Sequence, residues 1–456
     1  MNYLVMLAAR SAWNRRFVLS LVVASIALST LLLLGIERIR QDLRSNFSQA
    51  VSGTDLIVGA RTGPVQLLLY SVFRIGNATN NIRFTSAEAI AKHRAVAWLV
   101  PISLGDSHRG FAVLGTTPAY FQHFRYGAKQ PLVLAQGAPL TGQVSGQVSR
   151  QVSGQVGGQV GGQVGGQAGG QAGGQVSGLF DAVIGADVAR RLGYALGQRI
   201  VLSHGDGAMA ANDHANKPFA IVGILAPTGT PVDRTVHISL QAMEALHLDW
   251  AAGAPLPGMA VSASDAAAAD LTPRSITAAL IGLKSRAAVF SVQREVANFR
   301  DEPLLAILPG VALDELWDVV GLGERGLQAM SALVAAVSLA GLVAVILAGL
   351  NERRRELAIL RTVGAGPRQV MLLLALEGTL VTATGVLLGA LACWGTVALL
   401  GPWVQGRYGI SLHLQAPGSA EWTLMAAVLA GGVLASLLPG WRAYRLSLAD
   451  GLSPRT

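Results

Sequence analysis

The sequence predicts an α-helical membrane protein with four transmembrane helices and a large α+β extracytoplasmic domain, built of two subdomains on a helical stalk. Of the residues, 51% are hydrophobic and only 13% are charged, which is too apolar a composition for a soluble chain of this length. Four apolar runs approach the roughly 20 residues that cross a bilayer core of about 30 Å. Between the first and second runs, short strand-like and helix-like segments alternate, as in an α+β domain.

The four apolar runs are predicted to span the membrane. They cover Phe17–Ile36, Leu327–Leu350, Met371–Leu400 and Trp422–Leu438. The third is long enough to tilt in the bilayer or to extend beyond it. The first follows basic residues, as in a signal peptide, but its apolar run is longer than usual there and no small-residue cleavage site follows it. We therefore expect an uncleaved anchor.

The distribution of arginine predicts the orientation. Arginines are frequent in residues 1–16, in the short loop 351–370 and in the tail 439–456, whereas the short loop 401–421 has only Arg407. Short positively charged segments stay in the cytoplasm. We therefore expect a multi-pass inner-membrane protein with both termini inside and residues 37–326 in the periplasm. The net charge of +9 then reflects the cytoplasmic segments, and no nucleic-acid partner is expected.

The two ends of the external region are predicted to form the stalk. After the first span, apolar residues recur every three or four positions, which is one face of a helix. They are Ile36, Ile39, Leu43, Phe47 and Val51. Leu313, Leu316 and Val320 repeat this spacing before the second span. Two separate amphipathic helices lying on the membrane surface are the alternative.

The rest of the external region is predicted as two blocks of strands and helices. The first block has strands at Asp55–Gly59, Leu99–Leu104 and Phe111–Thr116, and helices at Pro64–Phe73 and Ser86–His93, with Ser86 as N-cap. The second has helices at Ala186–Leu192 and Ala242–His247, and strands at Arg199–Ser203 and Phe219–Leu225. Strands Ser275–Lys284 and Leu304–Leu308 flank a helix at Ala287–Phe299. No disulfide is expected here, because the single cysteine, Cys393, lies within a span.

A low-complexity insert separates the two blocks. Residues 142–177 form nine tetrapeptides of the type Gly-Gln-Val/Ala-Gly/Ser, with Arg150 in place of one glycine. A segment with almost no charge and no aromatic residue cannot bury enough apolar surface to offset its ordering entropy. We expect a flexible surface loop, and a stacked solenoid is the alternative.

The sequence has no convincing motif for catalysis or for nucleotide binding. The segment Gly321–Gly326 matches G-x-G-x-x-G, but it leads into a membrane span and does not follow a strand of a βαβ unit. The sequence contains no P-loop, no H-E-x-x-H and no G-x-S-x-G. We therefore expect no catalytic residue and no cofactor on this chain.

One predicted loop holds residue types that bind metals. His204, Asp206, Asp213 and His214 lie within eleven residues, and imidazole and carboxylate groups are ligands of zinc. A polar loop between two strands is the simpler interpretation, and both stay open.

A second loop, Pro227–Arg234, contains two prolines, a glycine and Asp233. The carboxylate of Asp233 can accept hydrogen bonds from the local backbone. We predict a structural turn, with a recognition edge as the alternative.

Within the spans, small and ionisable residues predict helix contacts. Gly385-x-x-x-Gly389 and Gly431-Gly432 allow helices to approach closely, and packing within the chain explains them as well as dimerisation does. Glu377 is the ionisable residue well inside a span. Because a carboxylate in lipid is costly, we expect it to face the bundle interior, for a structural hydrogen bond or a role in coupling.

The loop 351–370 is predicted to be an amphipathic helix. Its apolar residues Leu357, Leu360 and Val363 fall on one face. An amphipathic helix that is presented to the cytoplasm between two spans offers a surface to a partner protein.

The layout and four motifs together resemble one family. The motifs are Glu352–Ala365 (ERRRELAILRTVGA), Gly385-x-x-x-Gly389, Pro439-x-x-x-Ala443 followed by Arg445-x-Ser447, and Leu7–Arg16. With one span, a large external domain and three further spans, the chain resembles the permease subunits of MacB/FtsX-like ABC transporters, a group that includes the LolC/LolE-like subunits. In the tail, Leu448 stands where this family usually has a proline.

The resemblance implies a mechanism and partners. A separate ABC ATPase subunit, which binds ATP and Mg²⁺, would dock on the coupling helix at Arg353, Arg354, Glu356, Leu357, Leu360 and Arg361. Closure of two ATPases would tilt the spans, and the stalk would pass this motion to the MacB-like periplasmic core domain, which acts on a substrate outside the membrane. This process is mechanotransmission.

The family works as dimers, so a second copy or a related permease is an expected partner in the lipid membrane, and a periplasmic protein is a further candidate. Two alternatives stay open. One is an FtsX-like regulator of an extracytoplasmic enzyme. The other is a zinc-linked uptake component, suggested by His204 and His214.

Overall fold

The structure is a computed structural model that describes most of the chain. The described residues are 16–50, 52–141, 178–205, 213–251, 254–255, 261–352, 364–408, 412 and 414–445. They form two compact units. We call the unit of Met1–Ser45 and Asp318–Thr456 the helical unit, and the unit of Asn46–Trp317 the head. The predicted insert 142–177 lies outside the described residues. So does the start of the chain, residues 1–15, where the family resemblance implies an amphipathic cytoplasmic entry helix over residues 1–16.

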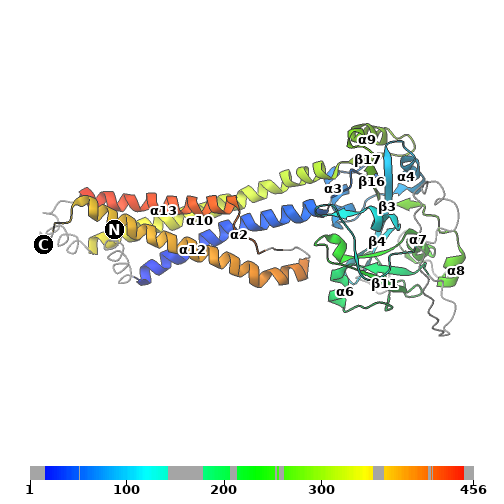
Figure 1. Cartoon of the computed structure of the whole chain (residues 1–456), viewed down its shortest axis with the longest axis horizontal. Coiled ribbons are helices and arrows are strands. Elements are labelled where there is room, and N and C mark those ends of the chain that lie inside the picture. Colours follow the sequence, from blue (N-terminus) through cyan, green and yellow to red (C-terminus); the bar gives the residue numbers. More distant parts are fainter. Residues whose placement is uncertain are drawn as a thin grey trace, which may run out of the picture. The chain divides into compact units, whose positions relative to one another are not determined.

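Four long helices contain the four apolar runs that were predicted to span the membrane (Figure 1). They are α2 (Arg16–Ala50), α10 (Pro309–Glu352), α12 (Pro367–Tyr408) and α13 (Ser419–Arg445). Each is long and apolar enough to cross a membrane. Both α2 and α10 extend well past the predicted spans, through Ile36, Ile39, Leu43 and Phe47 in α2 and through Leu313, Leu316 and Val320 in α10. Val51 lies outside the described residues. That these extensions act as a stalk stays a prediction.

One large mixed sheet of eleven strands forms the framework of the head. Its order is β17 (Leu304–Ile307), β1 (Leu56–Ala60), β16 (Ala278–Leu283), β3 (Val96–His108), β4 (Phe111–Thr116), β12 (Thr235–Ser239), β8 (Asp181–Ile184), β11 (Phe219–Leu225) and β7 (Leu134–Gly137). The short strands β10 (Ser203–His204) and β9 (Arg199–Ile200) pair with β3 and β11. Neighbours are antiparallel except in the pairs β12–β4 and β11–β8.

Two apolar clusters cover different parts of this sheet. One packs α4 (Phe84–Ala91) and α9 (Val289–Ala297) against β1, β16 and β17. The other packs α6 (Ala186–Leu192) and α7 (Leu240–His247) against β8, β11 and β12. Figure 1 shows α4 and α9 near one end of the sheet and α6 near the other. The strands of both predicted blocks join in this one sheet, so the division into two subdomains stays a prediction.

Short helices and strand pairs complete the head. The helices are α3 (Pro64–Leu68), the π-helical turn η1 (Leu69–Phe73), α5 (Ala119–His123), α8 (Ala263–Ala268), and the 3-10 turns η3 (Pro231–Arg234) and η4 (Arg286–Ala288). The strand pairs are β2 (Ile82–Arg83) with β15 (Ser275–Ile276), β5 (Arg125–Tyr126) with β6 (Gln130–Pro131), and β13 (Trp250–Ala251) with β14 (Ala254–Pro255).

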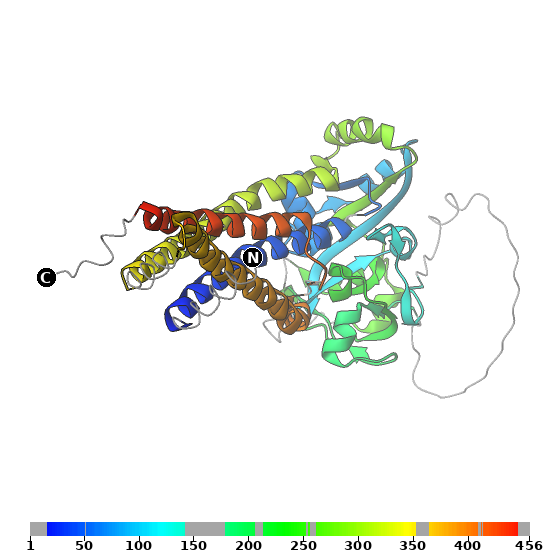
Figure 2. The same ribbon diagram turned by 60° about the vertical axis from the view of Figure 1, so that its left-hand side comes forward.

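Three local predictions were wrong. The predicted strand Arg199–Ser203 is divided into β9 and β10, which pair with different strands. Ser86 does not cap its helix: α4 begins at Phe84, its N-cap is Arg83 without a side-chain bond, and Ser86 is buried inside the first turn. The strand predicted to end at Leu104 continues to His108. It continues because a bulge between Leu104 and Ser107 absorbs Gly105, whose φ is +155°, and a bulge lets a strand bend without ending. The long cyan strand in Figure 2 is β3.

Candidate functional site

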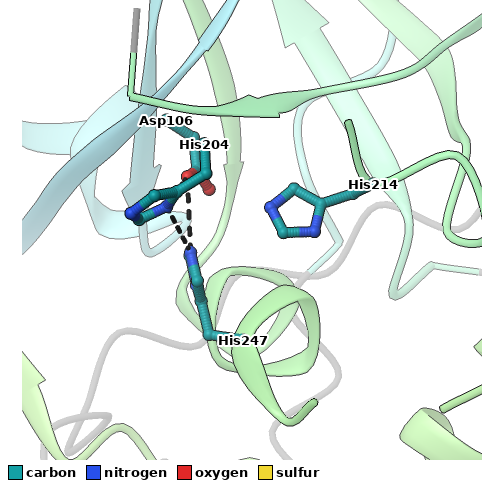
Figure 3. A group of neighbouring side chains, drawn as sticks. All are labelled: Asp106, His204, His214 and His247. Carbon is teal, nitrogen blue, oxygen red and sulfur yellow. Dashed lines mark hydrogen bonds and ion pairs between the residues drawn. The ribbon is translucent and has the colours of Figure 1, made fainter. Parts of the chain in front are cut away.

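Three histidines and one aspartate of the head converge on a small volume (Figure 3). Asp106, His204, His214 and His247 each offer one ligand atom, and these atoms all lie within 4.8 Å of one another. The four residues come from β3, β10, the segment before β11, and the end of α7. We call this group the histidine cluster.

Strand pairing places the first two members side by side. In the antiparallel pair β10–β3, His204 is the register partner of Asp106. Asp106 lies within the bulge between Leu104 and Ser107, and bulges re-aim side chains. His204 Nδ1 lies 3.0 Å from Asp106 Oδ1. Burial on its own would raise the pKa of Asp106, but hydrogen bonds from His204 and His247 outweigh it and hold the pKa at about 2.

His247 reaches the same carboxylate from the last position of α7. Its Nδ1 lies 2.9 Å from the carbonyl oxygen of Met243, which can only accept, so Nδ1 carries a proton. The other nitrogen, Nε2, lies 3.3 Å from Asp106 Oδ1 and 3.1 Å from His204 Nδ1. Burial would lower the pKa of His247, but hydrogen bonding to Asp106 and its negative charge raise it.

His214 completes the cluster from a buried position. Its backbone N–H donates to the carbonyl of Leu202 at 2.8 Å, and its side chain points toward the other three residues (Figure 3). Burial lowers the pKa of His214 to about 4, so the ring is neutral at pH 7. Among the described residues, neither His214 Nε2 nor Asp106 Oδ2 has a hydrogen-bond partner, although both atoms are buried.

A buried ion pair holds the segments that carry His214 and His247. Lys217 Nζ donates to Asp249 Oδ1 at 2.7 Å and to the carbonyl of Leu246 at 3.3 Å. Lys217 also donates its backbone N–H to the carbonyl of His214. Trp250 packs beside the cluster, with ring centroids 5.0 Å from His204 and 4.8 Å from His214. The Lys217–Asp249 ion pair and the ring of Trp250 therefore both hold the histidine cluster in place.

The predicted metal-type loop was found only in part. His204 and His214 come together, but Asp213 instead accepts a hydrogen bond from Ser203, and Asp206 lies outside the described residues. Asp106 and His247 were not predicted. They are distant in the sequence, and only the pairing of β10 with β3 and the docking of α7 bring them in.

The predicted turn at Pro227–Arg234 is confirmed. The carboxylate of Asp233 accepts hydrogen bonds from the backbone N–H groups of Thr228 and Gly229 and from the hydroxyl of Thr228. Asp233 itself is buried. This carboxylate organises the turn that leads into β12, which supports the structural interpretation.

The glycines singled out in the spans lie at close contacts within the helical unit. A Cβ at Gly385 or Gly389 of α12 would meet Ile26 of α2 at 2.7 Å or the carbonyl oxygen of Ala27 at 2.5 Å. A Cβ at Gly432 of α13 would meet Thr382 of α12 at 2.3 Å. These glycines let three helices of one chain pack closely.

Polar groups also lie inside the helical unit. Ser338 of α10 is 2.8 Å from Ser25 and 2.9 Å from Ser29 of α2, measured between hydroxyl oxygens. Glu377 is buried, 3% exposed, and its role in coupling stays a prediction. The predicted coupling residues Arg353, Arg354, Glu356, Leu357, Leu360 and Arg361 lie outside the described residues.

Two family models match the chain. A model of the MacB-like periplasmic core domain matches residues 19–279, which is more than half of the chain. A model of the FtsX-like permease C-terminal region matches residues 329–448. The first region contains most of α2 and the head up to the start of β16. The second contains the C-terminal part of α10 together with α12 and α13. The chain belongs to the MacB/FtsX/LolC-like family of ABC-transporter permeases.

The curated relatives include two lipoprotein-releasing system transmembrane proteins LolC of Xylella fastidiosa. The protein of strain 9a5c is 30% identical and that of strain Temecula1 is 31% identical, each over 118 residues. The match covers 22% of this chain and only 28% of each relative. Permease family membership therefore comes from the family models, and the relatives add a local likeness.

Two solved structures resemble the chain weakly. The periplasmic region of MacB from Actinobacillus actinomycetemcomitans aligns at a TM-score of 0.31 and 9% identity, over 59% of this chain and 94% of that chain. The extracellular domain of the noncanonic ABC-type transporter YknZ from Gram-positive bacteria aligns at 0.29 and 10%, over 56% and 99%. The family assignment does not depend on them.

Proposed function

We propose that this chain is the transmembrane subunit of an ABC transporter complex at the inner membrane. It couples ATP hydrolysis by a separate ATPase to movements of its periplasmic head. The observation that carries this proposal is the presence, in one chain, of an FtsX-like permease region at 329–448 and a MacB-like periplasmic core domain at 19–279. The absence of a P-loop from the sequence supports an ATPase on another subunit.

The coupling surface is the loop between α10 and α12. On the predicted helix, Leu357 and Leu360 would share an apolar face. Arg353, Arg354 and Arg361 would add positive charge at its rim. An apolar anchor buried in a groove of the ATPase would supply most of the affinity. The arginines at its rim would act mainly on the association rate and the register.

The continuity of α10 supports mechanotransmission. Strand β17 of the head sheet ends at Ile307, and α10 begins two residues later at Pro309 and continues to Glu352, next to the coupling loop. In the proposed mechanism, α10 is the element that connects the cytoplasmic coupling loop to the head by a single helix.

The substrate class to test first comes from the relatives. The two Xylella proteins carry the name of a lipoprotein-releasing system. We therefore propose export or extraction of a substrate, with a lipid-anchored protein as the first candidate, at the outer face of the inner membrane. A dimer with a second copy or a related permease provides the two ATPase docking sites.

Leu360→Asp tests the coupling surface. The substitution places an unpaired charge in a dry interface, which costs several kcal/mol (about 3–5). We expect this variant to lose co-purification with the ATPase and the stimulation of its hydrolysis, while the head remains folded. Arg354→Ala is the matched control and should bind more slowly with a smaller loss of affinity. Normal binding and stimulation by Leu360→Asp would show that this helix is not the coupling element.

A further inference from the structure

We propose that the head binds one divalent transition-metal ion of the zinc class through Asp106, His204, His214 and His247. This inference goes beyond the proposed permease function and does not depend on it. It rests on four observations: the distances between the ligand atoms, the buried polar atoms without partners, the groups that hold the ligands in place, and the chemistry of the ligand set.

The distances match one face of a tetrahedral site. Zinc–nitrogen and zinc–oxygen bonds of about 2.0–2.1 Å place neighbouring ligand atoms roughly 3.3 Å apart. His204 Nδ1, His247 Nε2 and Asp106 Oδ1 form a triangle with edges of 3.0, 3.1 and 3.3 Å. Such a triangle leaves room for an ion just above its plane, on the side from which a fourth ligand approaches.

His214 is the fourth ligand. Its ligand atom lies within 4.8 Å of the other three, so a small rotation of the ring brings it to the remaining corner of the tetrahedron. Figure 3 shows its ring facing the other three side chains across a short gap. Within the described part of the chain, His214 Nε2 and Asp106 Oδ2 are buried without a hydrogen-bond partner. Leaving buried polar atoms unsatisfied is unfavourable, and an ion that binds His214 removes one such atom.

The nitrogen of His247 that faces Asp106 also favours a cation. Nδ1–H of His247 donates to the carbonyl of Met243, so Nε2 is the nitrogen that faces Asp106 Oδ1. In the ion-free cluster a proton on Nε2 joins the two groups, and a metal ion would take the place of that proton on the lone pair of Nε2. The bond from the far ring nitrogen to a backbone carbonyl is also the usual second-sphere support of a metal-bound histidine.

The ligand set selects the class of ion. Three imidazoles and one carboxylate suit zinc and neighbouring ions such as nickel and copper(II), whereas magnesium and calcium prefer oxygen ligands. Four protein ligands close the tetrahedron, as in structural zinc sites, and leave no open position of the kind that catalytic sites keep. The side chains of His204 and His247 are each 29% exposed, so the ion can exchange with solvent.

Binding would tie three separate segments of the head together. Asp106 belongs to the central strand β3, His204 and His214 flank the loop after β10, and His247 ends α7. An ion that binds only the folded head stabilises it by RT ln(1 + [L]/Kd). The bound ion would therefore connect β10 and the segment of His214 to β3 and α7.

The test uses the purified full-length protein in detergent, without a histidine tag and after removal of metals with a chelator. We expect one equivalent of Zn²⁺ per chain by mass spectrometry after gel filtration, and visible absorption bands of four-coordinate Co²⁺ when cobalt is added. His204→Ala and His247→Ala, at the two partly exposed ligands, should each weaken zinc binding by about 10–100-fold or more. Mg²⁺ and Ca²⁺ should not compete with zinc.

His93→Ala is the matched control, because His93 is a partly exposed histidine of the head that pairs with Glu295 outside the cluster. It should bind zinc like the unmodified protein. Circular dichroism checks that each variant is folded, and the cobalt spectrum of the unmodified protein tests the site independently of any variant. The proposal is overturned if the unmodified protein binds no zinc, if cobalt gives an octahedral spectrum, or if folded His204→Ala and His247→Ala variants bind zinc normally.

Discussion

Lys217 is fully buried in the head, and its ammonium group binds Asp249 and the carbonyl of Leu246. Removing one partner of a buried ion pair leaves the other as an uncompensated charge, which costs about 3–5 kcal/mol. The pair also connects the segment of His214 to the end of α7. Its loss should therefore affect local stability and the histidine cluster together.

We predict that Lys217→Met speeds hydrogen–deuterium exchange in peptides that cover α7 and β11 of the full-length protein. The double variant Lys217→Met with Asp249→Leu should recover much of the protection, since replacing both charges by apolar groups is often neutral. Lys284→Met, at an exposed lysine that donates to the carbonyl of Arg94, is the control and should change little. Equal exchange in Lys217→Met and Lys284→Met would contradict the assigned role of the pair.

His237 is a second residue whose burial has a measurable consequence. It lies on β12, and its Nδ1 donates to the carbonyl of Val183 at 3.1 Å. Burial, with a smaller contribution from the positive charge of Arg74, lowers its pKa to about 3. The folded head thus keeps the neutral ring, whereas the unfolded chain takes up a proton near its ordinary pKa of about 6.5.

The stability supplied by His237 is therefore complete above about pH 6.5 and is lost as the pH falls toward 3. We predict that it contributes about 2 kcal/mol less to the stability of the head at pH 5 than at pH 7. The measurement is the urea midpoint of the full-length protein, followed by tryptophan fluorescence with a chelator present. His237→Gln should make the midpoint less dependent on pH. An unchanged pH dependence would show that His237 titrates normally.

The histidine cluster shows what sequence spacing can and cannot predict at this scale. His204 and His214 were found because they lie in one loop. Asp106 was missed because the predicted strand ended at Leu104, whereas β3 continues through a bulge that contains Asp106. His247 was placed correctly at the end of a helix, but no local pattern connects that helix end to β3, since the contact is made only by tertiary packing.

At the scale of elements, apolar periodicity predicted the helices and the regular strands well. The strands Phe111–Thr116 and Phe219–Leu225 and the helix Ala186–Leu192 agree with the structure at both ends. Each is bounded by turn residues and has a regular apolar pattern. Predictions were poorer where backbone geometry decides, as at the bulge of β3 and at the start of α4.

The glycines of α12 provide an internal comparison of close packing. A Cβ at Gly389 would lie 2.5 Å from the backbone oxygen of Ala27, and a backbone atom cannot move aside. A Cβ at Gly395 of the same helix meets no atom within 4 Å. The two positions thus differ in packing and share the helix propensity of glycine.

We predict that Gly389→Ala destabilises the helical unit by about 1–3 kcal/mol, as overpacking does. Gly395→Ala should be neutral or slightly stabilising, since alanine favours a helix over glycine by roughly 1 kcal/mol. The thermal midpoint of the purified full-length protein in matched detergent measures both. If Gly389→Ala is as stable as Gly395→Ala, α12 does not pack against α2 as described.

At the scale of the whole molecule, the family models and the four apolar helices define the class of protein. The proposed mechanism depends most on how the chain is oriented in the membrane. A head in the periplasm can receive a motion generated in the cytoplasm only if α2 and α10 cross the bilayer. Four crossings, an even number, place both termini on the same side of the membrane. From the arginines of residues 1–16, 351–370 and 439–456 we predict that this side is the cytoplasm.

Reporter enzymes fused after successive helices test this orientation. We predict external activity for fusions after Arg234 and Leu414, and cytoplasmic activity for fusions after Arg361 and Thr456, because each fusion adds one crossing to the one before it. If one helix does not cross the membrane, the alternation between external and cytoplasmic activity stops at the fusion that follows this helix. Cytoplasmic activity after Arg234 would mean that the orientation is inverted and that the arginine loop lies in the periplasm. A cytoplasmic ATPase could then not reach the surface at Leu360 on which coupling depends.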